Sequence, residues 1–371
     1  MIKYSIRRQA IIKFKELVKI NPYIIAETAY NHEGDYNYLK KMVNEIGNLN
    51  LNAVKFHLLL DPESYLQKNH PLKNKIKKWT FNKKEWEKIF EIADDLNLDI
   101  VALCDDFESL KFINNEIENI SIEAVELHAS SLNDYYLLEE AAKFENQVIL
   151  GVGGSTLDEI EFAVRMLKEN NKDDILLMYG FQSYPTDYNQ INLSKILKIK
   201  ELFNLPVGYA DHTGYDDPNN IDISVMGSAM GINVLEKHYT TDYGKERIDY
   251  QAAVGKEHFK KIKEKMKIYL SVYGDGSLNL SEPELKYGNT GPMKKAIVAN
   301  KEIKKGEVLT KDKLWFKRTE EESTVKQIQY QDLLGLKANK EIKEDEIIDF
   351  SKVDYEFQKQ SYEDLTGGLE E

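Results

Sequence analysis

The segment YIIAETAYNHEGDYNYLKKMVNEIGNLNLNAVKFHLLL, residues 23–60, contains the unit from which the fold of this chain is built. It begins with a short run of apolar residues at 23–28 and ends with a second such run at 53–60. Between the two runs, apolar residues recur at spacings of three and four, which is the period of a helix. A strand, a helix and a second strand in this order predict two parallel strands joined by a right-handed crossover.

The same alternation continues through most of the chain. Six further strand-like runs lie at residues 99–105, 124–129, 147–153, 174–180, 205–211 and 234–240. Helical patterns separate them, for example at 83–96, 157–170 and 257–270. Eight strand–helix units predict a closed (β/α)8 TIM barrel, which typically takes about 250 residues. An open doubly wound sheet is disfavoured, because its glycine-rich phosphate loop usually follows an early strand. Here GVGGS at 151–155 follows the fifth run and lacks the required spacing.

The pattern changes after residue 275. Residues 276–292 are rich in Gly, Ser, Asn and Pro, and we interpret them as a linker. Residues 293–354 contain short β-like pieces between turns, including the related stretches KKGE and KEDE. A domain of this size has little room for a core, so we expect it to lean on another surface. We therefore predict a barrel domain at 1–275, a linker, a small β-rich domain and an acidic tail at 355–371.

Composition limits the partners and the location of the protein. The 371 residues include 63 acidic and 50 basic side chains, which gives a formal net charge of −13. This charge argues against nucleic acid as a partner, because phosphate binding depends on clustered Lys and Arg. The single Cys104 excludes an intramolecular disulfide and favours a reducing compartment. No apolar run reaches the ~20 residues of a membrane span, so we expect a cytoplasmic protein without a membrane segment.

Polar side chains interrupt or close six of the eight strand-like runs, where apolar residues are expected. They are Glu27, Lys55, His57, Asp105, Glu126, His128, Asp211, His212, Glu236, Lys237 and His238. Barrel enzymes keep their active sites at the carboxyl ends of the strands, because the βα loops converge there. One such residue could be a satisfied polar group of the core. Six strands together predict an active site, since each buried charge needs a partner.

Two of these residues, His212 and His238, end the neighbouring seventh and eighth strands and can converge on one point. Two imidazoles with additional oxygen ligands suit a borderline divalent ion such as Mn²⁺, Zn²⁺ or Fe²⁺. Their spacing alone also fits two histidines that lie at the surface or cap an element. A metal site is therefore a hypothesis that the spacing favours but does not require.

Several ordered motifs resemble the sialic acid synthase, or nonulosonate synthase, family. They are IAETAYNHEG from Ile25, AVKF from Ala53, GYADHTGYDD from Gly208 and VLEKHYTTD from Val234. Members of that family typically read IAE-x-G-x-NH-x-G, VKFQ, SDHT and EKH[FY]T. The C-terminal segment AIVANKEIKKGEVLTKDKLWFKR resembles the antifreeze-like (SAF) module of the same family. The similarity runs in order along nearly the whole chain.

The resemblance implies an activity, a cofactor and an assembly. The family condenses phosphoenolpyruvate with an N-acylated aldose such as N-acetylmannosamine, and the products are a 3-deoxy nonulosonic acid and phosphate. It uses a divalent metal, commonly Mn²⁺, with Mg²⁺ or another ion as alternatives. It works as a domain-swapped homodimer in which each SAF module covers the barrel mouth of the partner.

The resemblance also assigns roles to single residues of the barrel. Glu27 matches an acid/base carboxylate near the donor carbon, where it can stabilise positive charge and orient a water molecule. Lys55 matches an active-site lysine whose charge suits the carboxylate or phosphate of the donor. His212 and His238 match the metal-ligand histidines, and the metal would act as a Lewis acid on the sugar aldehyde.

Further matches concern the acceptor sugar. Asp249, which we count with the catalytic residues, and Glu236 match carboxylates that contact the hydroxyl groups of the acceptor. Arg318 matches an arginine that reaches the acceptor's N-acyl group from the partner's SAF module, although an exposed basic residue on a loop would look the same. The other candidates for substrate contact are Asn31, His32, His57, His128, Ser130, Gln182, Tyr184, Asp211, Thr213 and Lys237.

The chain departs from the family mainly where the donor phosphate is held. Counting back from Ser130, the family's phosphate-contacting lysine corresponds to Leu127. The family motifs STPFD, STGMAT and CTSxYP read ALCDD, GVGGST and GFQSYP here, and the glutamine of VKFQ is His57. The residues that could rebuild a phosphate cradle are His128, Ser130, Ser131, Ser155 and Gln182. Past Arg318, TEEES replaces the family's glycine-rich turn.

These departures leave two alternatives open. One is a related metal-dependent carbon–carbon synthase or lyase that uses a different three-carbon partner. The other is a sugar-binding or scaffold protein that has lost catalysis. Binding alone would not need the acid/base and metal residues together, which favours an enzyme.

Overall fold

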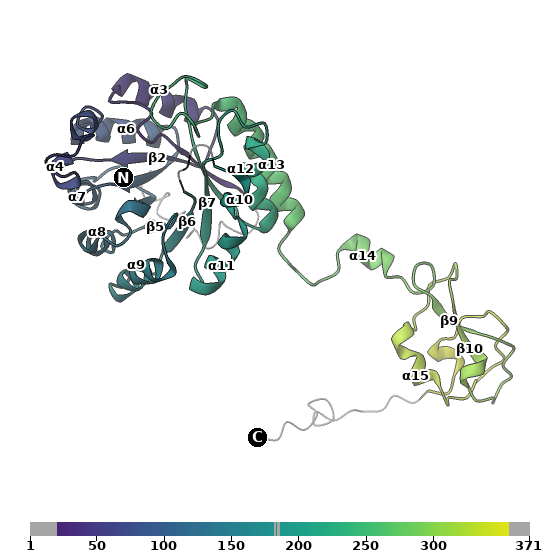
Figure 1. Ribbon diagram of the computed structural model, residues 1–371. Coiled ribbons are helices and arrows are strands. Elements are labelled where there is room, and N and C mark those ends of the chain that lie inside the picture. Colours follow the sequence, from purple (N-terminus) through teal and green to yellow (C-terminus); the bar gives the residue numbers. More distant parts are fainter. Residues whose placement is uncertain (1–20, 182, 184–185, 356–371) are drawn as a thin grey trace. The chain divides into compact units, whose positions relative to one another are not determined.

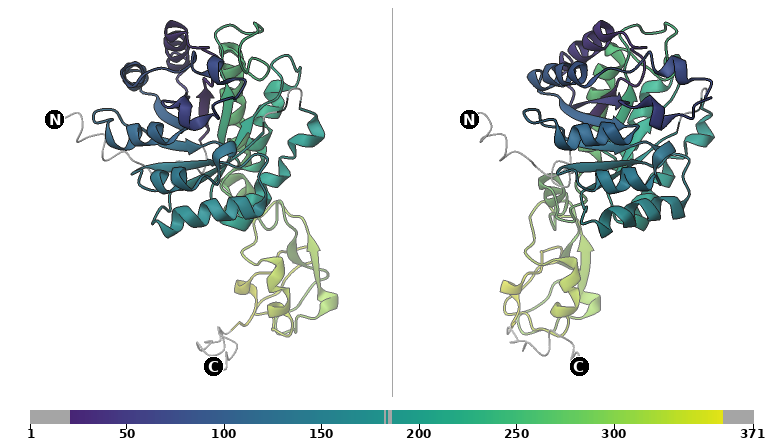
Figure 2. Two further views of the ribbon diagram at one scale, coloured as in Figure 1. Left: turned by 60° about the vertical axis from the view of Figure 1, so that its left-hand side comes forward. Right: turned by 90° about the vertical axis from the view of Figure 1, so that its left-hand side faces the viewer.

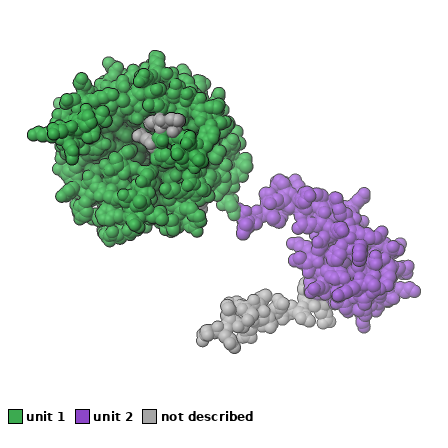
Figure 3. Space-filling view, viewed as in Figure 1, with its two compact units in different colours: residues 1–276 green, residues 277–371 purple. Residues whose placement is uncertain are grey.

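The computed structural model describes residues 21–181, 183 and 186–355. The chain folds as two compact units, residues 1–276 and 277–371, which Figure 3 colours separately. The first unit carries the strand–helix repeat and the second the β-like C-terminal pieces. Each unit is described by itself below.

The first unit is a closed barrel of eight parallel strands in the order in which they occur in the chain (Figure 1). The strands are β1 (Tyr23–Glu27), β2 (Ala53–Leu58), β3 (Asp99–Cys104), β4 (Ala124–Leu127), β5 (Gln147–Gly151), β6 (Ile175–Tyr179), β7 (Val207–Asp211) and β8 (Val234–His238). The predicted (β/α)8 barrel is confirmed. Each predicted run overlaps one strand, and the strands are shorter because several runs continue into the βα loops.

Helices form a layer around the strands, as the views in Figure 2 show. They are α3 (Tyr36–Gly47), α4 (Pro62–Tyr65), α5 (Lys73–Ile76), α6 (Lys83–Asp95), α7 (Phe107–Asn115), α8 (Tyr135–Ala141), α9 (Leu157–Glu169), α10 (Tyr188–Ile191), α11 (Ser194–Phe203), α12 (Asn220–Met226) and α13 (Lys256–Tyr273), with 3-10 turns η1 (Ala129–Ser131) and η2 (Gly227–Met230). Side-chain caps begin several of them, including capping boxes at Asn82 and Thr156. Within the described residues, no helix is long and apolar enough to cross a membrane.

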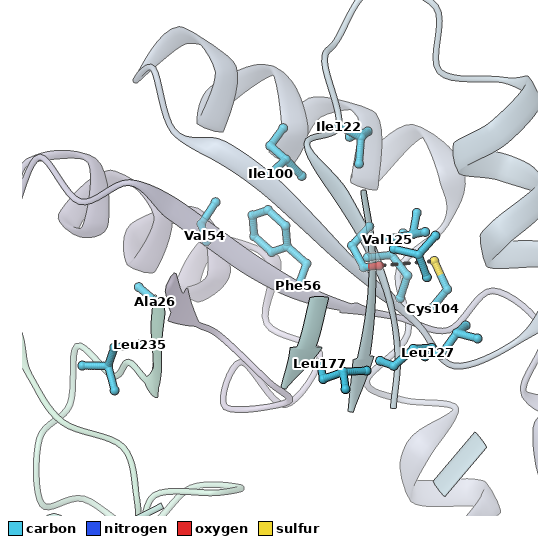
Figure 4. Close-up of a cluster of buried hydrophobic side chains, with 14 of the residues drawn as sticks. Ala26, Val54, Phe56, Ile100, Cys104, Ile122, Val125, Leu127, Leu177 and Leu235 are labelled. Atoms are coloured by element: carbon cyan, nitrogen blue, oxygen red, sulfur yellow. Dashed lines mark hydrogen bonds between the residues drawn. The ribbon is translucent and has the colours of Figure 1, made fainter. Parts of the chain in front are cut away.

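Alternation along the strands separates two apolar layers. Small and branched residues such as Ile25, Ala53 and Ala124 form one cluster, which fills the barrel interior. The intervening residues, among them Val54 and Leu127, pack against the helices in a much larger cluster (Figure 4). A side chain's position along its strand therefore decides whether it faces the interior or the helices.

The strand register brings polar residues together at one end of the barrel. Glu27 lies opposite Lys55 of β2 on one side and opposite His238 of β8 on the other. Glu236 of β8 lies opposite Ile25, two residues before Glu27, so it faces the interior in the next layer down. Glu27 and His238 end their strands, and Lys55 and Glu236 lie further inside the barrel below the carboxyl ends, where the sequence predicts the site.

The second unit has its own core. Its elements are α14 (Glu282–Tyr287), β9 (Ala296–Ala299), η3 (Lys311–Lys313), β10 (Leu314–Lys317), η4 (Gln327–Gln329), α15 (Tyr330–Leu333) and η5 (Phe350–Lys352). The strands β9 and β10 pair antiparallel, and buried residues such as Ile297, Leu314 and Ile342 pack beside them. The segment interpreted as a linker contains α14, which begins with a capping box between Ser281 and Glu284.

Candidate active site

A buried lysine surrounded by three carboxylates lies inside the barrel near the carboxyl ends of the strands. The Lys55 Nζ atom is 3.1 Å from Glu27 Oε1, 3.1 Å from Glu126 Oε2 and 2.7 Å from Glu236 Oε1. All four side chains are at most 4% exposed. Three carboxylates facing one ammonium leave the cluster with excess negative charge, so its protonation state is decided by local geometry.

The carboxylates of this cluster differ in proton affinity. Burial alone would raise the pKa of Glu27, but Lys55, His238 and His57 outweigh it and hold that pKa well below its usual value. Burial raises the pKa of Glu236 well above its usual value, and the nearby charge of Glu27 adds to the effect. Of this pair, Glu27 therefore loses its proton more readily than Glu236.

Two histidines contact Glu27 from the neighbouring strands. His57 Nε2 lies 2.6 Å from Glu27 Oε1, and this hydrogen bond fixes the orientation of both groups. His238 Nε2 lies 3.2 Å from Glu27 Oε2, although the angle does not make a hydrogen bond and the described residues give this nitrogen no other partner. The His212 ring is 5.1 Å from the His238 ring, measured between centroids.

The two histidines His212 and His238 fit a metal in their chemistry. Burial lowers the pKa of each to about 4, so both are neutral imidazoles at neutral pH, which is the form that binds metals. The Nε2 of His238 is buried and makes no hydrogen bond to any described residue, so it can take a further partner. Across the described ranges, no group of three or more His, Cys, Asp or Glu side chains is arranged to hold an ion. Two imidazoles would therefore leave positions for water or substrate.

Two loops close over this end of the barrel. The side-chain amide of Asn31, after β1, donates to the Ile248 carbonyl of the loop after β8 at 2.8 Å. Arg247 of the second loop donates to the Asn31 carbonyl. Its guanidinium carbon lies 3.8 Å from the centroid of the Tyr38 ring. His32 is buried, and its Nδ1 accepts from the Gly34 amide. Asn31 and His32 thus shape the first loop from within.

Asp249 lies on the second loop in a left-handed conformation, with φ of +61°. Such a backbone is uncommon for a residue other than glycine, and it persists only where the surroundings fix it. Burial raises the pKa of Asp249, and its carboxylate accepts a hydrogen bond from the Tyr30 amide. Asp249 therefore connects the two loops that Asn31 and Arg247 also hold together.

Asp211 and Lys237 form a buried ion pair with each other. Asp211 lies two residues after Tyr209 on β7, and Lys237 lies two residues after Leu235 on β8. Because Tyr209 and Leu235 belong to the layer between strands and helices, Asp211 and Lys237 face that layer too. Asp211 also accepts from the Thr213 hydroxyl at 2.6 Å and from Ser224 of α12 at 2.5 Å. The structure thus places Asp211, Lys237 and Thr213 behind His212, where they position its loop.

The opposite side of the barrel mouth carries the candidates for donor binding. His128 follows β4, and its Nδ1 atom is 2.8 Å from the Ser130 hydroxyl. A cavity of about 600 Å³ is lined by Ser130, Ser131, Gly153 and Ser155, together with other residues of these two loops. Gly153 has no room for a side chain, since a Cβ atom would lie 1.6 Å from the Gly180 carbonyl oxygen. Gln182 and Tyr184 lie outside the described residues.

The structure corrects the interpretation of Leu127 on β4. Leu127 is fully buried among the side chains that pack between strands and helices, and Figure 4 labels it there. The position of β4 that faces the interior at this level is Glu126, whose two oxygens both lie 3.1 Å from Lys55 Nζ. Glu126 therefore places a carboxylate beside Lys55, on the side of the barrel that carries the candidates for donor binding.

Arg318 follows β10 in the second unit and is exposed. Its guanidinium donates to the Pro292 carbonyl of the same unit, through Nε at 2.9 Å and through Nη2. The described contacts of Arg318 thus lie within its own unit.

Comparisons with known proteins decide the family. The NeuB family model matches residues 39–277, and the SAF domain model matches residues 294–354. The first match covers more than half of the chain and spans the barrel from α3 to the end of α13. The chain belongs to the NeuB family.

Several proteins similar to this chain are named synthases. N,N'-diacetyllegionaminic acid synthase of Campylobacter jejuni is 30% identical over 88% of this chain and 98% of its own length. Pseudaminic acid synthase of Campylobacter jejuni is 28% identical over 86% of this chain and 93% of its own length. The crystal structure of N-acetylneuraminic acid synthetase from Leptospira borgpetersenii, in complex with citrate, has a TM-score of 0.66 and 28% identity and covers 72% of this chain and 90% of that chain.

Sequence reasoning missed three residues of this NeuB site. It noted Glu126 as a polar strand residue but gave it no role, although alternation from Ala124 would have placed it inward. It also missed Tyr30, whose hydroxyl donates to Asp105 at 2.8 Å, and Arg247. The last two act across loops that are far apart in the sequence, and no local pattern marks such contacts.

Proposed function

We propose that this NeuB family member condenses phosphoenolpyruvate with an N-acylated aldose such as N-acetylmannosamine. The donor's C3 would form a bond to the aldehyde carbon of the sugar, and water would add at the donor's C2 as phosphate leaves. The products would be a 3-deoxy nonulosonic acid and phosphate. The observation that carries the proposal is the buried contact of Glu27 with Lys55, His57 and His238 in a NeuB barrel. A cytoplasmic location belongs to the same proposal.

Glu27 would be the acid/base residue. Its pKa is held low by Lys55, His238 and His57, so it is anionic and can stabilise the positive charge that develops at the donor's C2. The same oxygens can accept a proton from the water that attacks this carbon. His57, bonded to Glu27 at 2.6 Å, would fix the direction of the carboxylate.

His212 and His238 would hold a divalent ion, most simply Mn²⁺, which supplies Lewis acidity toward the sugar aldehyde. Neutral imidazoles 5.1 Å apart between ring centroids and the unpartnered Nε2 of His238 support this assignment. The Asp211–Lys237 pair behind His212 would keep its loop in place.

The acceptor would lie under the two loops that Asn31 connects. Asp249 and Glu236 would accept hydrogen bonds from its hydroxyl groups, and Lys55 would attract the donor's anionic groups. We further propose a domain-swapped homodimer in which Arg318 of one protomer reaches the N-acyl group bound by the partner. The C-terminal residues form a separate compact unit, and the segment that joins this unit to the barrel includes α14. This arrangement supports such an exchange.

A phosphate-release assay tests the proposal. The protein is mixed with phosphoenolpyruvate and a panel of N-acylated aldoses, with Mn²⁺ or with a chelator. We expect release that requires both substrates and the metal. Release that requires the metal but no aldose, or no release although a sugar binds, would contradict the proposal and would favour another synthase or a sugar-binding protein respectively.

A further inference from the structure

The barrel interior offers one lysine to an anionic donor. The eight barrel strands contain two lysines, Lys55 on β2 and Lys237 on β8. Lys237 is paired with Asp211 in the layer next to the helices. Lys55 faces the interior, but its ammonium already contacts three carboxylates at 2.7 to 3.1 Å. A donor that carries a phosphate and a carboxylate must therefore compete for Lys55 with groups of the protein.

Of the three carboxylates, Glu126 competes most directly with the donor for Lys55. Glu27 is engaged by His57 and lies beside His238, and Glu236 is on β8, the strand that ends at His238. Glu126 differs because both of its oxygens are directed at Lys55, and no other side-chain partner is recorded for it in the described residues. It is also on β4, directly before the loop of His128 and Ser130 that lines the donor side. A donor phosphate that approaches Lys55 from this loop meets Glu126 first.

We propose, on the basis of the function proposed above, that Glu126 is a specificity-determining residue for the donor: it binds the donor phosphate as a neutral acid and takes up a proton from solvent when the donor binds. In that form its hydroxyl donates a hydrogen bond to a phosphate oxygen. The ammonium of Lys55, released from one carboxylate, can then contact the donor. No covalent bond of the protein changes, and the proton comes from water.

The surroundings of Glu126 make this proton uptake favourable. The charged and titratable groups that face it are Lys55 and His57 of β2 and Glu27 of β1, with Glu236 of β8 on the other side of Lys55. Burial raises the pKa of Glu126, Glu27 raises it further, and Lys55 opposes the shift. A bound phosphate adds negative charge nearby, which raises the pKa again. Donor affinity should therefore fall as pH rises through the pKa of Glu126 in the free protein.

Calorimetry on the full-length protein tests the proposal without a variant. Phosphoenolpyruvate is titrated above about pH 7.5, where a phosphate monoester is already fully ionised in solution. The binding heat is compared in two buffers that differ in ionisation heat. We expect uptake of about one proton for each donor bound and a loss of affinity of up to about tenfold for each pH unit. Binding without proton uptake would overturn the proposal.

The variant Glu126→Gln locates the proton. Its amide is neutral at every pH and can donate to phosphate, so we expect no proton uptake, no pH dependence in this range and at least tenfold tighter donor binding at the highest pH. Glu123→Gln, which removes a carboxylate just before the other end of β4, is the matched control and should keep the wild-type proton uptake. Equal uptake in wild type and Glu126→Gln would overturn the assignment to Glu126.

The outcomes separate this inference from the proposed function. If phosphoenolpyruvate is turned over but its binding shows no linkage to Glu126, the inference alone fails. If the donor binds neither the wild type nor Glu126→Gln, and no aldose releases phosphate, both fail. Thermal unfolding of each variant shows whether it is folded, and the wild-type titration decides the question if Glu126→Gln is not.

Discussion

The two sides of the barrel mouth differ in how they relate to the NeuB family. On the side of β7, β8 and β1, His238 lies 3.2 Å from Glu27, and the rings of His212 and His238 are 5.1 Å apart between centroids. On the side of β3, β4 and β5, the buried carboxylate of Glu126 contacts Lys55 and the His128 imidazole lies beside Ser130, where the resemblance implies a lysine and hydroxyl groups. Under the proposed function, this difference means that the chain keeps the chemistry at the aldehyde and holds the donor in a different way.

The contrast is electrostatic as well as compositional. Around His212 and His238 burial produces neutral imidazoles, which favour a cation. Around Lys55 burial and mutual repulsion raise the pKa values of Glu126 and Glu236. Both regions lie at the same end of the barrel. Because their charges differ, variants on the two sides should have different kinetic effects.

The largest effect is expected for the two histidines. His212→Ala or His238→Ala should reduce turnover below detection while the protein remains folded, because each removes a proposed nitrogen ligand of the metal. Phosphate release with added Mn²⁺, together with bound metal measured after dialysis, checks this. His70→Ala is the matched control, because the Nδ1 atom of His70 accepts only from the Leu72 amide of its own loop in the contacts described. Turnover near that of wild type in chelator-treated buffer would contradict the metal assignment.

A smaller loss is expected at Glu27. Glu27→Gln should keep metal and substrate binding but slow the chemical step by about 10² or more, the usual contribution of an acid/base group. Rapid-quench measurement of a single turnover separates this step from binding and product release. Glu123→Gln serves again as a control, since it neutralises a carboxylate at the far end of the barrel. Unchanged single-turnover rates would remove Glu27 from the mechanism.

Arg318 tests whether the acceptor side extends beyond one protomer. Arg318→Ala should raise the Michaelis constant for the N-acyl aldose and leave that for phosphoenolpyruvate nearly unchanged. Lys317→Ala is the control, because Lys317 is the neighbouring basic residue and pairs with Asp345 in its own unit. A change in both constants to the same degree would indicate a structural effect.

The exchange itself is tested by mixing two impaired variants. Glu27→Gln protomers and Arg318→Ala protomers are combined under conditions that allow subunits to exchange, after each is shown to be severely impaired alone. In a domain-swapped heterodimer one site carries both changes and the other carries neither, so activity should return. Verified heterodimers without recovery, or a strictly monomeric protein, would exclude the exchange.

The smallest effect is a difference in stability at the other end of β4. Burial, with Asp99 and Asp174 nearby, raises the pKa of Glu123 to about 7 in the folded protein. Because this pKa is raised, the stability that Glu123 contributes is present below the unfolded pKa and is lost as pH rises through about 7. Glu123→Gln should therefore raise the melting temperature at pH values above this pKa, with a difference that disappears toward acid pH. Equal shifts at all pH values would contradict this origin.

The sequence allowed the barrel to be predicted because eight apolar runs alternate with helical periods. The same alternation places Glu27, Lys55, His57 and His238 toward the interior, where Glu27 contacts each of the other three. The interpretation of Leu127 was wrong because it was based on a count from Ser130 and not on the alternation within β4. Lys237 was counted with the substrate contacts because it stands beside His238 in one motif. Adjacent residues of a strand face opposite sides, so Lys237 faces the helices and His238 faces the interior.

Other features of the site depend on contacts between distant loops. Arg247 contacts Asn31 in the loop after β1, although the two are 216 residues apart in the sequence. Tyr30 contacts Asp105, which is 75 residues away in the sequence. The left-handed backbone of Asp249 follows from the same loop packing. No residue spacing within a loop predicts these contacts, because they form only when the closed barrel brings the loops after β1, β3 and β8 together.

The central claim, carbon–carbon bond formation between phosphoenolpyruvate and an N-acylated aldose, is tested most directly by following a labelled donor carbon. Phosphoenolpyruvate with ¹³C at C3 is incubated with the protein, Mn²⁺ and the aldose that supports most phosphate release, and the products are followed by NMR. We predict that the label appears in the C3 methylene group of a 3-deoxy sugar acid, with one phosphate released for each product. Label that remains in phosphoenolpyruvate or appears only in pyruvate, while the metal and the aldose are present, would contradict the account.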